Sequence, residues 1–176
     1  ALQFDGVDDY VDLGTLSGFP TAAPLTIVAW VRKTRAPTTD EKVFCGHTQN
    51  FCFYQKVANS KMTLGKQGFD EVVSNTAISD TNWHHVVVSY DGTNANFYLD
   101  GVADGSPAYS SSFSASPTFI AVGFYTGVLS GYTPGLLDDV RVYNRALSAG
   151  EITQLYRMGN KPVIANASAN LKLTSG

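Results

Sequence analysis

Two adjacent carboxylates, Asp138 and Asp139, stand at the start of the otherwise apolar strand pattern in the stretch LLDDVRVYN. Successive side chains on a strand point to opposite faces, so no more than one of the two serves any given site. Catalysis, metal binding and a solvated charge at a strand end are all open uses. An ion pair of Asp139 with Arg141 or Arg145 is a further use for the second carboxylate.

Tyrosines close to glycines and amides form a second candidate group. The stretch GFYTGVLSGYTPG carries Tyr125 and Tyr132, and the stretch CGHTQNFCFYQK carries Asn50 and Tyr54. Aromatic faces beside planar polar groups suit stacking and hydrogen bonding with a sugar ring. Loops on a rigid scaffold commonly hold such residues. We therefore take these four as candidate ligand contacts, with packing inside the fold as the alternative for each tyrosine.

The two cysteines of the chain, Cys45 and Cys52, are separated by six residues that favour a turn between two strands. This spacing allows a disulfide across a hairpin, and two separate buried thiols are the alternative. His47 lies between them, but it does not complete the four-ligand set of a zinc site.

Short runs with period-two alternation dominate the chain, among them LTIVAWVRK, HHVVVSYDG and TFIAVGFY. The Asp91-Gly92 pair between two such runs predicts a hairpin turn. Many short strands without a long helix predict an all-β fold, namely a two-sheet antiparallel sandwich of the jelly-roll kind.

One short helix is predicted near the C-terminus. Ser148 can serve as the N-cap, and Glu151 three residues later completes a capping box. Ile152 and Leu155 then belong to the buried stripe, and Gly159 fits the left-handed position that ends a helix. We expect this helix to pack against the sandwich.

The 176 residues are enough for one domain with a core of its own, which we expect over residues 1–159. Residues 160–176, rich in Asn, Ala and Ser, read as a linker or the start of another module. A net charge of −3 offers no basic field for nucleic acid, and no apolar run has membrane-spanning length. Arg32, Lys33 and Arg35 form a small basic patch, which is either a contact for acidic glycans or a solvated strand end.

Four stretches in order make this sequence resemble a known family: LQFDGVDDYVDLG, LTIVAWVR, WHHVVVSYDGTNANFYLDG and LDDVRVYNRALSAGEITQLY. It resembles the laminin G-like jelly-roll family of the concanavalin A-like lectin/glucanase superfamily. The resemblance implies a two-sheet sandwich that is one module of a larger secreted or cell-surface protein. It also implies ligands that are mostly carbohydrates or proteins.

A structural calcium ion is the cofactor that the resemblance implies, at the place where the first and last strands run together. The matching carboxylates are Asp138, at the start of DDVRVY, and Asp5 in FDG, with the Gly6 carbonyl beside it. Calcium binds a mixture of carboxylate and carbonyl oxygens, as this set would provide. Asp8 and Asp9 are the second choice of ligands.

Polysaccharide hydrolases of this superfamily act from a sheet face with two carboxyl groups about 5 Å apart. No two acidic residues of this chain stand at i and i+2, which disfavours such an enzyme. The leading expectation is a non-catalytic, lectin-like module that binds a glycan or cell-surface polysaccharide. The alternative is an adhesion or spacer domain that binds protein or no ligand, and a polysaccharide-cleaving enzyme comes third. Neither nucleic acid nor a membrane is an expected partner.

Overall fold

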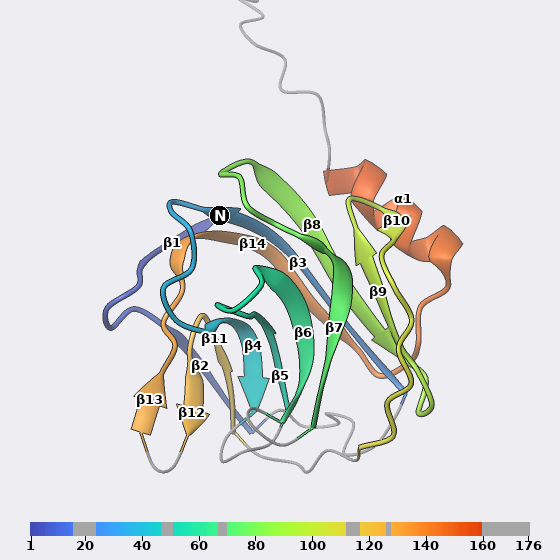
Figure 1. Ribbon diagram of the computed structural model, residues 1–176, viewed down its shortest axis with the longest axis horizontal. Coiled ribbons are helices and arrows are strands. Elements are labelled where there is room, and N and C mark those ends of the chain that lie inside the picture. The colour runs from blue at the N-terminus through green and yellow to red at the C-terminus, as the bar shows by residue number, and fades with distance from the viewer. Residues whose placement is uncertain (16–23, 47–50, 67–69, 112–116, 126–127, 160–176) are drawn as a thin grey trace, which may run out of the picture.

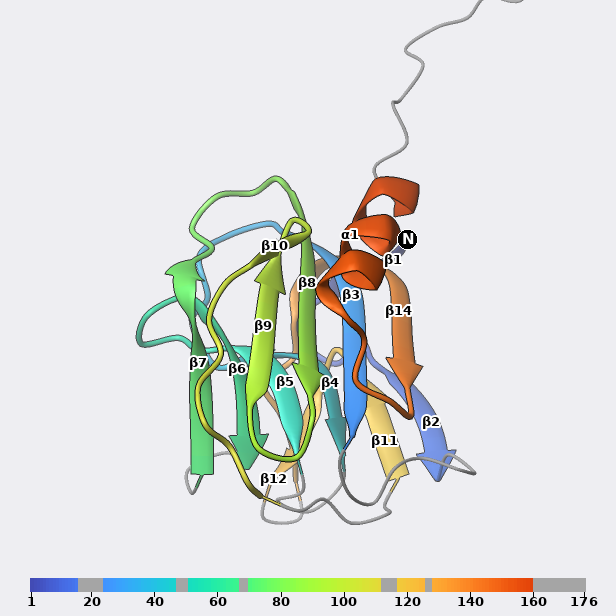
Figure 2. The ribbon, with the colours of Figure 1, turned by 90° about the vertical axis from the view of Figure 1, so that its right-hand side faces the viewer.

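Two six-stranded antiparallel sheets pack face to face in the computed structural model of the chain (Figures 1 and 2). The structure describes residues 1–15, 24–46, 51–66, 70–111, 117–125 and 128–159, and the predicted linker, residues 160–176, lies outside them. The sandwich confirms the predicted fold class.

Sheet A has the strand order β1-β14-β3-β8-β9-β10. Its strands are β1 (Leu2–Asp5), β14 (Pro134–Tyr143), β3 (Leu25–Lys33), β8 (Trp83–Tyr90), β9 (Ala95–Leu99) and β10 (Val102–Ala103). Sheet B has the order β2-β11-β4-β5-β6-β7. Its strands are β2 (Val11–Thr15), β11 (Pro117–Ile120), β4 (Glu41–Gly46), β5 (Cys52–Gln55), β6 (Lys61–Lys66) and β7 (Asp70–Ala77).

The main core lies between the two sheets, and alternation along each strand explains it. On β3, Ile27, Ala29 and Val31 point into this core, while Val28 points to the outer face of sheet A. Phe53 of β5 enters the core from the opposite sheet. Both faces of the strand LTIVAWVRK are apolar because one face packs in the core between the sheets and the other packs on the outer side of sheet A.

Helix α1 (Ala149–Gly159) covers the outer face of sheet A, as Figure 2 shows from that side. Its Ile152 is fully buried in a cluster with Val28, Val87 and Leu147. The predicted capping box is confirmed, because the Ser148 amide and hydroxyl donate to Glu151 Oε2 at 2.9 and 2.8 Å. The helix therefore begins where the sequence indicates.

Gly159 is the last residue of the helix, but its role differs from the one predicted. It does not adopt the left-handed conformation. A Cβ added at this position would lie 2.3 Å from Trp30 Nε1. The Trp30 indole stacks on Tyr156 at 5.6 Å between ring centroids, so glycine is required where the helix end passes over that indole. The predicted end of the helix at Gly159 is confirmed, whereas the predicted left-handed conformation of this residue is wrong.

A small hairpin, β12 (Gly123–Tyr125) and β13 (Val128–Ser130), lies on the opposite side of the molecule from α1 (Figure 1). It packs over Lys42 of β4. A Cβ at Gly123 or at Gly131 would lie 3.1 or 3.0 Å from Lys42 Cε. The hairpin thereby covers part of the outer face of sheet B. Among the described residues, no helix is long and apolar enough to cross a membrane.

Candidate functional site

The outer face of sheet B carries a group of aromatic side chains. On β2, Val11 and Leu13 pack against the core, so Asp12 points outward. Asp12 pairs with Phe119 of β11, and residues opposite each other in a ladder share a face. The ring of Tyr10, just before β2, lies 6.1 Å from the Phe119 ring and belongs to the same face.

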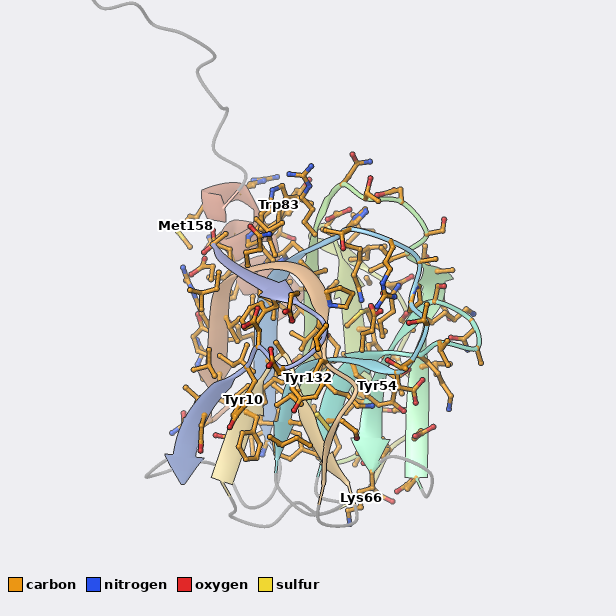
Figure 3. All side chains as sticks on the ribbon, turned by 90° about the vertical axis from the view of Figure 1, so that its left-hand side faces the viewer. Tyr10, Tyr54, Lys66, Trp83, Tyr132 and Met158 are labelled. Carbon is orange, nitrogen blue, oxygen red and sulfur yellow. A yellow bond between two sulfur atoms is a disulfide. The ribbon has the colours of Figure 1, made fainter. Side chains whose placement is uncertain are left out.

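Tyr10 also lies beside Tyr132, with ring centroids 6.4 Å apart and ring planes inclined at 57°. Tyr10 is 42% exposed and Tyr132 is half-buried. Figure 3 looks onto this side of the molecule and shows Tyr10, Tyr132 and Tyr54 in a row across it. We call Tyr10 and Tyr132 the tyrosine pair. It joins the predicted Tyr132 to a residue that was not predicted.

The backbone on both sides of Tyr132 is held by hydrogen bonds. The Lys42 amide donates to the Gly131 carbonyl at 3.1 Å, and the Thr133 hydroxyl donates to the Lys42 carbonyl at 2.6 Å. The Thr133 amide donates to the Ala121 carbonyl at 2.9 Å. Tyr132 is therefore presented by a segment tied to β4, which limits the entropy that a ligand contact would cost.

Residues 5–9 form an acidic loop directly before Tyr10. Oxygens of Asp5, Asp8 and Asp9 all lie within 4.8 Å of one another, and the three side chains are exposed. The Val7 amide donates to Asp5 Oδ1 at 2.7 Å, and the Asp5 amide donates to Asp9 Oδ2 at 3.0 Å. The hydrogen bond from Val7 holds the pKa of Asp5 below its usual value. Asp5 is thus ionised at neutral pH and available to a cation.

Two ligands of one calcium ion are at most about 5 Å apart, because each lies 2.3–2.6 Å from the ion. The oxygens of the acidic loop meet that limit, so these residues fit a calcium ion. The predicted ligand Gly6 is in the loop with φ of 79°, and a Cβ there would lie 2.8 Å from the Pro134 Cβ. Glycine at this position lets the loop pass close to the start of β14.

Asp138 does not join this set. In the ladder between β1 and β14, Asp5 is opposite Pro134 and Leu2 is opposite Leu137. Asp138 is therefore level with the other end of β1, roughly 13 Å along the strand from Asp5. The register therefore separates the two predicted ligands, whereas the second choice, Asp8 and Asp9, lies beside Asp5.

Asp139 forms the ion pair considered from the sequence. The Arg141 guanidinium donates to its two carboxylate oxygens at 2.8 and 2.6 Å. The other cation considered for Asp139, Arg145, donates to Glu151 at 2.7 Å instead. Asp139 thus contacts a cationic side chain through this bidentate pair, and Asp138 Oδ1 accepts from the Asp139 amide at 2.9 Å.

Tyr54 lies on the same face but is fully buried, so it offers no surface to a ligand. Its hydroxyl donates to Glu71 Oε1 at 2.5 Å, and Lys42 Nζ lies 4.0 Å from its ring centroid. Lys42 is itself fully covered, its Nζ makes no hydrogen bond, and burial lowers its pKa to about 8. Beside them, Cys45 and Cys52 are joined in a disulfide between β4 and β5.

The remaining candidates, Asn50 and the side chain of Tyr125, lie outside the described parts of the structure. Tyr10 is the residue that sequence reasoning missed. A usable signal was present, because the inward Val11 and Leu13 of the run YVDLG place Tyr10 and Asp12 on the outward side.

Solved structures share this architecture. Domain 4 of AbnA, a GH43 extracellular arabinanase from Geobacillus stearothermophilus in complex with arabinotriose, matches with a TM-score of 0.70 and 19% identity over 88% of this chain and 75% of that one. A SAP-like pentraxin from Limulus polyphemus matches at 0.65 and 18%, covering 88% and 80% of the two chains. The CBM40 of the Ruminococcus gnavus IT-sialidase, bound to α2,3-sialyllactose, matches at 0.65 and 15%, covering 88% and 98%. At these identities the likeness establishes the fold.

No curated protein sequence matches the chain. The model of one protein family, described as the concanavalin A-like lectin/glucanases superfamily, matches residues 5–153, which include every strand of both sheets except most of β1, and the start of α1. Together with the jelly-roll sandwich described above, this match shows that the chain belongs to the concanavalin A-like lectin/glucanases superfamily.

Proposed function

We propose that the chain is a non-catalytic carbohydrate-binding module and that the tyrosine pair is its sugar contact. The observation that carries the proposal is an exposed aromatic side chain, Tyr10, beside a second tyrosine whose backbone is fixed on both sides. Rings of this kind stack on the apolar faces of sugars, and their hydroxyls bond to sugar hydroxyls. The carbohydrate-binding modules among the structural neighbours support the same class of function.

The angle between the two rings bears on the shape of the ligand. Planes inclined at 57° form a corner and do not make a flat platform. A corner contacts one sugar ring from two sides, whereas a flat crystalline polysaccharide needs coplanar rings. The pair therefore suits a single residue of a soluble glycan.

Calcium is the second part of the proposal. The acidic loop would bind one ion through Asp5, Asp8 and Asp9, and that ion would order the chain leading directly into Tyr10. Without a cation, three carboxylates this close repel one another. Calcium would thus stabilise the loop and hold the tyrosine pair in its arrangement.

A non-catalytic role agrees with the carboxyl groups whose pKa is displaced. Asp5, Asp80, Asp91 and Glu151 all have a lowered pKa, because each accepts hydrogen bonds from its neighbours. A general acid for glycoside cleavage needs a raised pKa. An extracellular or cell-surface setting belongs to the same proposal, supported by the Cys45–Cys52 disulfide.

A glycan array tests the proposal, with arabinotriose and α2,3-sialyllactose among its members, probed with calcium and with chelator. We expect binding in calcium, and weaker binding in chelator because Tyr10 loses its support. Tyr132→Ala and Tyr10→Ala should each reduce binding roughly tenfold, the equivalent of one stacking contact. Met158→Ala is the matched control, since Met158 is 55% exposed on helix α1.

If the folded protein binds no member of the array, that result would contradict the proposal and favour an adhesion or spacer domain. Binding that persists in both tyrosine variants would contradict the assignment of the contact. Equal binding with calcium and with chelator would remove the metal from the proposal and leave the sugar contact. Release of reducing ends from any polysaccharide would contradict the non-catalytic role.

A further inference from the structure

We infer that the tyrosine pair selects neutral glycans over acidic ones. This inference rests on the proposed function and specifies its ligand class. It follows from the charges around the pair, which are all of one sign among the exposed groups next to it.

Four carboxylates adjoin the tyrosine pair in the chain: Asp5, Asp8, Asp9 and Asp12. All four are exposed. Asp9 directly precedes Tyr10 in the chain. The side chain of Asp12 points to the outer face of sheet B, as that of Tyr10 does. Within the described residues, none of the four forms a salt bridge. A divalent cation in the acidic loop would still leave two of the charges uncompensated.

The basic patch predicted from the sequence does not offset this charge. Lys33 is buried and pairs with the fully buried Glu41, so it cannot meet an acidic sugar, while the partly exposed Arg35 donates to the same carboxylate. Arg32 donates to the Thr81 carbonyl at 3.3 Å and lies at the end of β3 in sheet A. Lys33 is therefore not the solvated strand-end charge that the alternative expected.

Two cations on the outer face of sheet B, Lys42 and Lys56, are engaged with other groups, whereas Lys61 and Lys66 belong to β6, four strands away from β2 in the sheet. Lys42 is fully covered and lies over the Tyr54 ring, and Lys56 pairs with Glu71 of β7. Lys66 lies at the end of the face, apart from the tyrosine pair, as Figure 3 shows. An anionic sugar at the pair would therefore meet uncompensated carboxylates and, as far as the described residues go, no exposed cation beside it. A neutral sugar avoids this repulsion and keeps the stacking contact.

Matched glycan pairs test the inference on the intact chain. Lactose is compared with α2,3-sialyllactose, and neutral array members are compared with their uronate or sulfate counterparts, in 20 mM and 200 mM salt. We expect each neutral member to bind several-fold more tightly at low salt. The preference should narrow at high salt, since screening weakens repulsion between exposed charges.

Asp12→Asn gives a sharper test, because it removes one charge outside the acidic loop. The Asn side chain keeps an oxygen that can accept from the Gly14 amide, as Asp12 Oδ1 does at 2.8 Å. The ratio of acidic to neutral binding should rise about threefold. Asp91→Asn, at the turn between β8 and β9, makes the same change in net charge and should leave the ratio unchanged.

Tighter binding of the acidic members, or an unchanged ratio in Asp12→Asn, would overturn the inference while the proposed function stands. Absence of binding to every glycan would instead overturn the proposed function, and the inference with it. An equal rise of the ratio in Asp91→Asn would also overturn the inference, because it would show an effect of net charge alone.

Discussion

The two outer faces of the sandwich are built in opposite ways. The outer face of sheet A is apolar, with Val28 and Val87 at its centre, and helix α1 covers it through the fully buried Ile152. The outer face of sheet B carries tyrosines, a disulfide and a buried lysine. Among the described residues, only a small hairpin lies over it, and no helix does.

This difference shows how one sequence separates stability from recognition. An apolar face must be covered, since leaving it in water forfeits its hydrophobic stabilisation. A face of hydroxyl-bearing rings and charges tolerates water and can keep Tyr10 exposed for a ligand. Changes to the sheet A face should therefore lower stability alone, whereas changes to the tyrosine pair should lower binding alone.

Ile152→Ala is expected to have the largest effect on stability. Removing this fully buried side chain leaves a cavity under the helix, which should lower the free energy of unfolding by about 3 kcal/mol. Urea unfolding measures the loss, and Met158→Ala on the same helix should cost less than about 0.5 kcal/mol. Equal costs for the two variants would show that the helix does not cover the sheet as described.

Loss of the Cys45–Cys52 disulfide should cost slightly less. The two cysteines are seven positions apart, and closing a loop of that size stabilises a fold by about 2.5 kcal/mol. Reductant should shift the urea midpoint of the native protein downwards. It should leave the doubly substituted Cys45→Ser, Cys52→Ser protein unchanged, which controls for other effects of the reductant. An unshifted midpoint in the native protein would contradict a stabilising role on the sheet B face.

Lys42→Met should act in the opposite direction and raise stability. Burial lowers the Lys42 pKa from 10.5 to about 8, so charging this amine in the folded protein costs free energy. Attraction between the Lys42 ammonium and the Tyr54 ring offsets part of this cost. The free energy of unfolding of the variant should therefore be higher by about 2 kcal/mol at pH 7. Urea unfolding at a series of pH values measures this gain.

The pH dependence of that gain has a definite sign. Between pH 8 and 10.5 the unfolded protein binds more protons at Lys42 than the folded protein does, so wild-type stability rises with pH there. The advantage of Lys42→Met should accordingly be complete below pH 8 and vanish above about pH 10.5. An advantage that does not change across this range would show that the ammonium of Lys42 is not the cause.

Much of the fold could be predicted because patterns within short stretches of the sequence determine its strands and its helix. Alternation in LTIVAWVRK and HHVVVSY indicates strands, and the Ser148–Glu151 capping box locates the start of the helix, as their hydrogen bonds confirm. The role of Gly159 could not be predicted, since it depends on Trp30, a residue far away in the chain.

The site was harder to predict because it depends on register and on three-dimensional neighbours. Asp5 and Asp138 come from strands that do pair, but the ladder separates them along its length. Tyr54 looked like a loop tyrosine, yet it is a strand residue beneath Lys42. Tyr132 meets Tyr10 only through folding, although the outward position of Tyr10 was readable from its neighbours.

The stack of Tyr156 on Trp30 has an optical consequence. Of the two tryptophans in the chain, Trp30 lies under the end of helix α1, and Trp83 begins β8. The indole Nε1 of Trp30 is buried without a hydrogen bond, a dry environment that shifts indole emission to shorter wavelength. In a Trp83→Phe background, the fluorescence of Trp30 would therefore report when the helix lifts from its sheet.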